Sequence, residues 1–142
     1  MRSRSKTVVS YTMSRIRSKN TLIEKMMSSA LSNVGLKGYR KHSKNIMGKP
    51  DFVWEKYKIA VFCDSAFWHG YKKMATKIHN FRRRKAYWLN KISKNIERDK
   101  TVSRALRKDG WKVIRFWDFQ IVKNPQTCAQ KIAIACNERT KK

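Results

Sequence analysis

Carboxylates are scarce in this 142-residue chain, which has 9 aspartates and glutamates against 35 lysines and arginines and a formal net charge of +26. So large a basic excess predicts a polyanionic partner, and nucleic acid is the leading candidate. An anionic membrane surface is the alternative, but the sequence has no isolated basic amphipathic helix to serve it. Because no run of 18 apolar residues occurs, we expect no membrane-spanning helix.

Cysteine is also rare, and no proline- or glycine-rich linker divides the chain. The three cysteines are widely spaced, which predicts neither a disulfide framework nor a Cys-x-x-Cys metal site and favours a reducing, cytoplasmic location. The hydrophobic content of 41% is enough for one core. We expect a basic flexible arm over 1–20, a single domain over 21–138 and a basic tail over 139–142.

Hydrophobic periodicity and turn residues predict the secondary structure. A Thr21-x-x-Glu24 capping box opens the first helix, and an apolar stripe that includes Leu89 marks the longest one. The order of elements predicts an α/β sandwich in which helices flank a small mixed β-sheet. The predicted helices cover 21–34, 86–108 and 125–138, and the predicted strands cover 38–42, 51–54, 58–64 and 111–117.

Acidic residues mark the ends of the two middle strands. Asp51 begins one strand and Asp64 ends its antiparallel neighbour, so pairing of the strands brings the two acids close together. Carboxylates beside a phosphate suit Mg²⁺, and His69 in the following loop suits the activation of water. Other interpretations stay open: Asp51 as a turn residue, Asp64 as a cap that ends its strand, and His69 as a solvated side chain.

Further polar and aromatic residues adjoin these positions. Asn95 and Asp99 fall on the predicted buried stripe of the long helix and need polar partners there. The adjacent aromatics Phe67 and Trp68 either pack in the core or stack on DNA bases. We expect the flanking basic residues to hold DNA phosphates; they are Arg15, Arg17, Lys19, Lys49, Lys72, Arg82, Arg83 and Arg84.

A set of segments between about 13 and 118 carries a family resemblance. They are Met13, Arg15, Thr21-x-x-Glu24-Lys25, Gly48-Lys49-Pro50-Asp51-Phe52-Val53, Phe62, Phe67-Trp68-His69, Trp88-Leu89-x-Lys91-Ile92-x-Lys94-Asn95-x-Glu97-Arg98-Asp99 and Gly110-Trp111-x-Val113. Their combination resembles the very short patch repair (Vsr) mismatch endonucleases, whose catalytic pattern is shared by the EDxHD homing endonucleases. The resemblance implies a restriction-endonuclease-like core of the PD-(D/E)XK type with three layers, and Mg²⁺-dependent cleavage of one DNA strand, with two ions expected.

The resemblance also implies a role for each matched position. Asp51 would bind metal through its side chain and Cys63 through its backbone carbonyl, while Asp64, in place of a family histidine, would add a carboxylate to the metal site. His69 would activate the attacking water. Glu24, Asn95 and Asp99 would orient His69 or the metal-bound waters. Phe67 and Trp68 would intercalate beside a T:G mismatch.

Four positions depart from the repair enzymes, because Ala66, Tyr71, Lys73 and Phe119 stand where their zinc ligands are expected. We therefore expect no structural zinc. The predicted activity is Mg²⁺-dependent nicking of double-stranded DNA at T:G mismatches or a short target, by a monomer. A nuclease of a mobile-element or homing system is one alternative, and a non-catalytic basic nucleic-acid-binding protein is another. Partner proteins of a repair or mobile-element system stay open.

Overall fold

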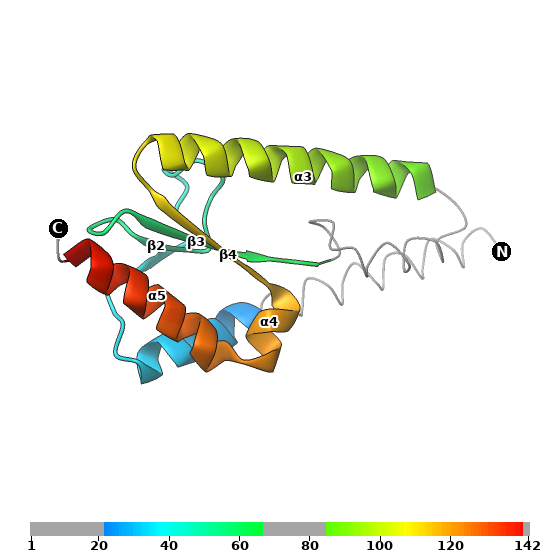
Figure 1. Ribbon diagram of the computed structural model, residues 1–142. Coiled ribbons are helices and arrows are strands. Elements are labelled where there is room, and N and C mark those ends of the chain that lie inside the picture. Colours follow the sequence, from blue (N-terminus) through cyan, green and yellow to red (C-terminus); the bar gives the residue numbers. More distant parts are fainter. Residues whose placement is uncertain (1–21, 67–84, 141–142) are drawn as a thin grey trace.

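A four-stranded mixed β-sheet lies at the centre of the computed structural model, which describes residues 22–66 and 85–140 (Figure 1). The strands lie in the order β1-β2-β3-β4, with β1–β2 and β2–β3 antiparallel and β3–β4 parallel. The predicted mixed sheet is therefore confirmed. The strands are β1 (Arg40–Lys41), β2 (Phe52–Trp54), β3 (Ile59–Asp64) and β4 (Lys112–Trp117).

Helices cover both faces of this sheet, as predicted (Figure 1). Helix α3 lies on one face, and the helix over 22–33 lies with α5 on the other. The parallel pairing of β3 with β4 needs a long crossover, and α3 is part of that connection. The labelled helices are α3 (Lys85–Lys108), α4 (Asp118–Lys123) and α5 (Pro125–Thr140).

Alternation along β3 divides the core into two clusters. Ile59 and Val61 pack with the 22–33 helix and α5, whereas Ala60 and Phe62 pack against α3. The same alternation continues to the end of the strand, so Cys63 adjoins the first cluster and Asp64 falls on the α3 face. The last two residues of β3 are thereby presented to opposite sides of the sheet.

The structure corrects three details of the predicted elements. The sequence did not predict α4, whose six residues bury only Ile121 and are too few to show a helical period. Helix α5 continues to Thr140, beyond the expected end at Glu138. Leu89 is 41% exposed, because the first turns of α3 project past the described strands (Figure 1).

The predicted arm over 1–20 and the loop over 67–84 lie outside the described residues. Within 22–66 and 85–140, no helix has the combination of length and apolarity that crossing a membrane requires.

A tight contact in the loop before β2 yields a stability prediction. Gly48 and Gly35 both have a left-handed backbone, with φ of 80° and 73°. A Cβ at Gly48 would collide with Val102 of α3, whereas one at Gly35 would meet no atom within 4 Å. Both alanine variants incur roughly 1–2 kcal/mol of backbone strain. We expect Gly48→Ala to lose a further 1–3 kcal/mol, roughly, through overpacking.

Urea unfolding of the two variants measures the difference, with Gly35→Ala as the matched control. Equal losses in the two variants would contradict the predicted contact between the loop and α3.

Candidate active site

Asp51 is held at the start of β2 by three hydrogen bonds. Its backbone N–H donates to Val61 O at 2.9 Å, and its carbonyl accepts from the N–H of His42 at 3.2 Å. Its carboxylate Oδ2 accepts from the backbone N–H of Cys63 at 2.6 Å. The side chain is therefore fixed against the end of β3, and the predicted approach of Asp51 to that strand end is confirmed.

Glu24 and His42 lie beside Asp51 and form a cluster with it. The Glu24 carboxylate Oε2 lies 3.0 Å from His42 Nε2, and Asp51 Oδ1 lies 4.0 Å from His42 Nδ1. One potential ligand atom from each of the three residues lies within 4.8 Å of the others. The cluster joins the 22–33 helix, the residue that follows β1 and the residue that precedes β2, so the tertiary fold assembles it.

Burial raises the pKa of Asp51 from 3.8 to about 6. The Cys63 N–H and His42 act in the opposite direction, whereas the nearby charges of Glu24 and Asp64 raise this pKa further. Three carboxylates thus approach one another in a chain dominated by positive charge. A bound cation would relieve this repulsion, so the donor set fits a divalent metal ion.

The Cys63 thiol is a poor metal ligand in this setting. Burial raises the pKa of the thiol, with the charge of Asp51 as the next cause, so the sulfur stays protonated near neutral pH. The backbone carbonyl of Cys63 is better placed to bind a metal ion. In an extended strand the N–H and C=O of one residue point to the same side. The Cys63 carbonyl therefore faces the same side as the N–H that bonds Asp51.

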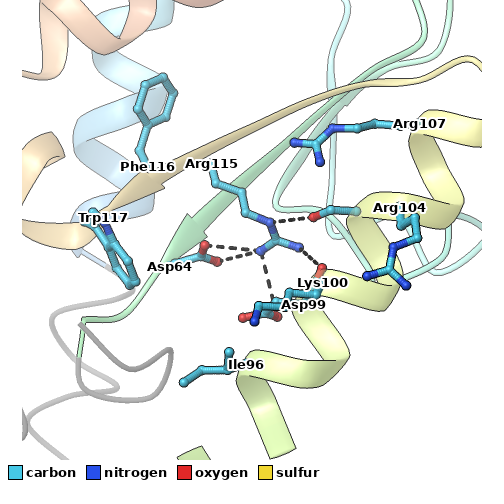
Figure 2. A pocket seen from close by; sticks show the side chains of 10 residues that line it. Asp64, Ile96, Asp99, Lys100, Arg104, Arg107, Arg115, Phe116 and Trp117 are labelled. Atoms are coloured by element: carbon cyan, nitrogen blue, oxygen red, sulfur yellow. Dashed lines mark hydrogen bonds and ion pairs between the residues drawn. The ribbon is translucent and has the colours of Figure 1, made fainter. Parts of the chain in front are cut away.

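Asp64 lies in a second polar group on the α3 face, where Arg115 of β4 is its main partner (Figure 2). Arg115 Nη1 donates to both Asp64 oxygens at 3.1 Å, and Nε donates to Ser103 Oγ at 2.9 Å. The same guanidinium lies 3.8 Å from the Asp99 carboxylate and stacks 4.0 Å from the ring centre of Phe62. Arg115 thus ties β3, β4 and α3 together.

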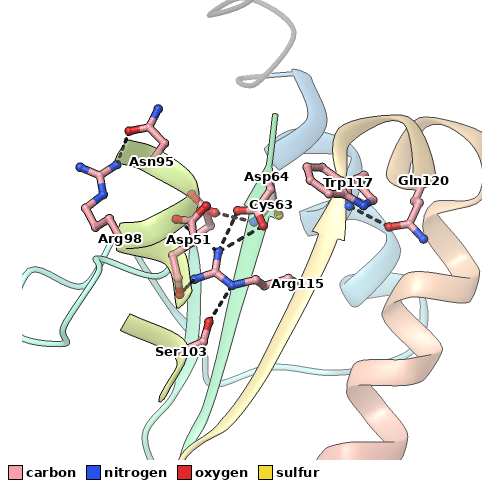
Figure 3. Close-up of polar contacts among 10 residues, drawn as sticks. Asp51, Cys63, Asp64, Asn95, Arg98, Ser103, Arg115, Trp117 and Gln120 are labelled. Carbon is pink, nitrogen blue, oxygen red and sulfur yellow. Dashed lines mark hydrogen bonds and ion pairs between the residues drawn. The ribbon is translucent and has the colours of Figure 1, made fainter. Parts of the chain in front are cut away.

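This arrangement alters the predicted role of Asp64. The predicted metal role places its carboxylate with Asp51, but the structure places it against Arg115 (Figure 3). Within the described residues, the potential ligands that lie close enough together to hold one metal ion are Glu24, His42 and Asp51, and Asp64 is not among them. The carboxylate still raises the pKa of Asp51, so the two polar groups are neighbours.

A pocket of about 500 Å³ opens beside the Arg115 group (Figure 2). Asp64, Asp99 and Arg115 line it, and Trp117 at the end of β4 contributes an aromatic ring. Its α3 side is basic, with residues spaced at i, i+4 and i+7 on one helical face. These basic residues are Lys100, Arg104 and Arg107.

The other predicted site residues are distributed as follows. Asn95 accepts a hydrogen bond from Arg98 at 3.3 Å, within a helix that continues unbroken through Asp99 (Figure 3). Lys49 is exposed and has a φ of 52°. Ala66 is buried, and Phe119 stacks on Trp117. Outside the described residues lie Arg15, Arg17, Lys19, Phe67, Trp68, His69, Tyr71, Lys72, Lys73, Arg82, Arg83 and Arg84.

His42 and Arg115 were not among the site residues predicted from the sequence. Arg115 left a signal, because it is a charged residue within an otherwise apolar run of β4 and so needs an internal partner. His42 left almost none, since a lone histidine in a polar segment is ordinary. For Glu24 the capping box offered a sufficient local explanation, and the contact with His42 appears only in three dimensions.

Residues 3–75 match the family described as DNA mismatch endonuclease Vsr. The chain is 42% identical to the type II nicking enzyme V.NmeDIP of Neisseria meningitidis serogroup C, over 87% of this chain and 82% of that protein. It is 37% identical to the type II nicking enzyme V.HpaIIP of Haemophilus parainfluenzae, over 87% and 86%. It is 35% identical to the DNA mismatch endonuclease Vsr of Escherichia coli, over 72% and 64%.

The Arg115–Asp64 pair yields a prediction about stability. Both side chains are largely buried, so removal of the cation leaves an uncompensated carboxylate. We expect Arg115→Met to lower the free energy of unfolding by about 3 kcal/mol, and the double variant Asp64→Asn/Arg115→Met to recover much of that loss. Urea unfolding measures both values.

Arg98→Met on the exposed surface of α3 is the matched control and should change stability by less than about 0.5 kcal/mol. A loss in Arg115→Met no larger than this control would contradict the buried pair.

The raised pKa of Asp51 yields a prediction about pH. Between the unfolded value of 3.8 and the folded value of about 6, the native state holds a proton that the unfolded state has released. Without metal, stability should therefore fall as the pH rises through this window, by on the order of 2–3 kcal/mol. Asp51→Asn should flatten this slope and be more stable than wild type above pH 6.

Urea unfolding in EDTA from pH 4 to 7.5 tests the slope, with the exposed Asp109→Asn as the control that keeps it. An unchanged slope in Asp51→Asn would show that another group is responsible.

Proposed function

This chain belongs to the Vsr family of DNA mismatch endonucleases, and from that premise we propose that it nicks one strand of double-stranded DNA with Mg²⁺ held at Asp51. It is a DNA endonuclease, and its relatives include proteins named as type II nicking enzymes. The observation that carries the proposal for the metal is the convergence of Glu24, His42 and Asp51 beside the end of β3.

Two ligands from the chain support a magnesium site. Asp51 supplies a carboxylate that the Cys63 N–H holds in place, and the Cys63 carbonyl faces the same side. Mg²⁺ keeps several waters and binds few protein oxygens, so one carboxylate and one carbonyl suffice for an ion that also contacts a phosphate. A bound Mg²⁺ would polarise the scissile phosphodiester and stabilise the leaving oxygen. Two such ions are proposed to take part.

His69 is the proposed general base, because an imidazole can accept a proton from water near neutral pH. Glu24 and Asp99 are proposed to orient waters or polar groups from opposite sides of the strand end, and Asn95 to assist from α3. For Asp64 we now propose a role through Arg115, because the pair places a fixed cation beside the pocket.

DNA binding is proposed to use the basic residues on both sides of this site. Lys100, Arg104 and Arg107 line the pocket and can each neutralise a phosphate. The arm over 1–20, Lys49 and the basic residues near 82–84 are proposed to follow the DNA backbone, while Phe67 and Trp68 stack within the duplex.

The arrangement of layers supports a restriction-endonuclease-like core of the PD-(D/E)XK type in one domain over 21–138, with a short basic tail. We propose a monomer on DNA, with T:G mismatches as the preferred target. The free cysteines in the described residues suit the reducing cytoplasm, where this DNA would lie. Because the positions expected for zinc ligands carry Ala66 and Phe119, the loop that bears His69 is proposed to need no zinc.

A nicking assay tests the catalytic proposal. Wild type with Mg²⁺ should nick duplex DNA that contains a T:G mismatch faster than the matched duplex. Asp51→Asn and His69→Gln should lose more than about 100-fold in rate while still binding DNA. Asp109→Asn, an exposed change away from the site, is the control and should act as wild type does.

The outcomes separate the competing functions. Wild type that binds DNA but never nicks either duplex would favour a non-catalytic binding protein. Equal cleavage of matched DNA at a fixed sequence would favour a homing-type nuclease.

A further inference from the structure

Both ring nitrogens of His42 face carboxylates. Nε2 lies 3.0 Å from Glu24 Oε2 and Nδ1 lies 4.0 Å from Asp51 Oδ1. An ionised carboxylate can only accept a hydrogen bond, so the 3.0 Å contact places the proton on Nε2. In the neutral ring, Nδ1 then keeps its lone pair and directs it toward the Asp51 side of the cluster.

The backbone fixes this orientation. His42 directly follows β1 and has a φ of 50°, a left-handed value that is uncommon for a residue with a side chain. Its N–H donates to the carbonyl of Asp51 at 3.2 Å, so the two residues are joined through the main chain as well. The His42 side chain is 56% exposed, which leaves the ring open to an ion from solvent.

We propose that His42 is a ligand, through Nδ1, of the divalent ion that Asp51 holds, and that Glu24 positions the ring by accepting the Nε2 proton. This inference rests on the proposed metal centre at Asp51. It adds a nitrogen donor to a site of oxygen ligands. The ions whose binding affinity gains most from this donor are transition metals such as Mn²⁺.

The distances suit this assignment. Two ligands of one ion, each about 2.1 Å from it, lie at most about 4.2 Å apart. The separation of 4.0 Å between Nδ1 and Asp51 Oδ1 falls within that limit, so only small side-chain shifts are needed. The hydrogen bond from Nε2 to Glu24 is then kept, and it forms the carboxylate–histidine–metal arrangement by which proteins orient imidazole ligands.

A nitrogen ligand changes the choice among ions. Oxygen ligands and water suit Mg²⁺, whereas an imidazole adds affinity for first-row transition metals. The chain should therefore bind Mn²⁺ more tightly than Mg²⁺ by a margin that depends on His42. Loss of the ring should reduce Mn²⁺ affinity by more than about 10-fold and change Mg²⁺ affinity much less.

Electron spin-echo modulation of bound Mn²⁺ detects the nitrogen directly, because a ligand ¹⁴N couples to the ion much more strongly than a ¹⁴N that is not bound to it. The experiment uses the full chain without DNA. The sequence has three histidines, so His42→Gln is compared with the controls His69→Gln and His79→Gln. We expect ¹⁴N modulation in wild type and in both controls, and its loss in His42→Gln.

Several results would overturn the proposal: wild type that binds no Mn²⁺, Mn²⁺ bound without ¹⁴N modulation, or modulation that survives in His42→Gln. The variant Asp51→Asn distinguishes a failure of the His42 proposal from a failure of the metal centre on which that proposal rests. If Asp51→Asn binds Mn²⁺ as wild type does, the centre at Asp51 is wrong. If it loses Mn²⁺ while His42→Gln keeps the nitrogen signal, only the role of His42 is wrong.

Variants at Glu24 test the positioning role. Glu24→Gln keeps an oxygen that can accept the Nε2 proton, whereas Glu24→Ala removes it. Titration calorimetry should show Mn²⁺ affinity reduced by about 10- to 100-fold in Glu24→Ala and largely rescued in Glu24→Gln. Equal losses in both variants would indicate that the charge of Glu24, and not its hydrogen bond to His42, is what matters, and would overturn the positioning role.

Discussion

The hydrogen bond from the Cys63 N–H to the Asp51 carboxylate is the contact on which the site depends. It joins the start of β2 to the end of β3 at 2.6 Å and holds a carboxylate whose burial raises its pKa. Glu24 and His42 gain significance only because Asp51 is fixed beside them. The antiparallel pairing of β2 with β3 supplies the register that makes the contact possible.

Electrostatics then divides the acids into two groups with opposite character. Asp51 and Glu24 share their surroundings with a histidine, which leaves negative charge available to a cation. Asp64 and Asp99 face Arg115, which supplies a cation within the fold itself. Alternation along β3 explains the division, because Cys63 and Asp64 point to opposite faces of the sheet. One strand end thus faces the proposed metal ligands on one side and a buried guanidinium on the other.

Much of the fold could be predicted from local patterns. The strand near Val61 and the helix around Ile92 followed from runs and periods that the structure keeps, and the approach of Asp51 to β3 followed from strand pairing. Long-range side-chain partners could not be predicted. His42 meets Glu24 across 18 positions, and Arg115 meets Asp64 across 51. No local pattern encodes such contacts, because they depend on how the layers pack.

The parallel pairing of β3 with β4 also determines the order in which the site can form. Asp51 and Cys63 are 12 positions apart and share a hairpin, so their contact closes early at a small cost in chain entropy. The whole of α3 separates Arg115 from Asp64 along the chain, and such non-local pairing is slow to form. During synthesis the hairpin with the proposed metal ligands precedes Arg115, and the candidate site is complete only once β4 has joined the sheet.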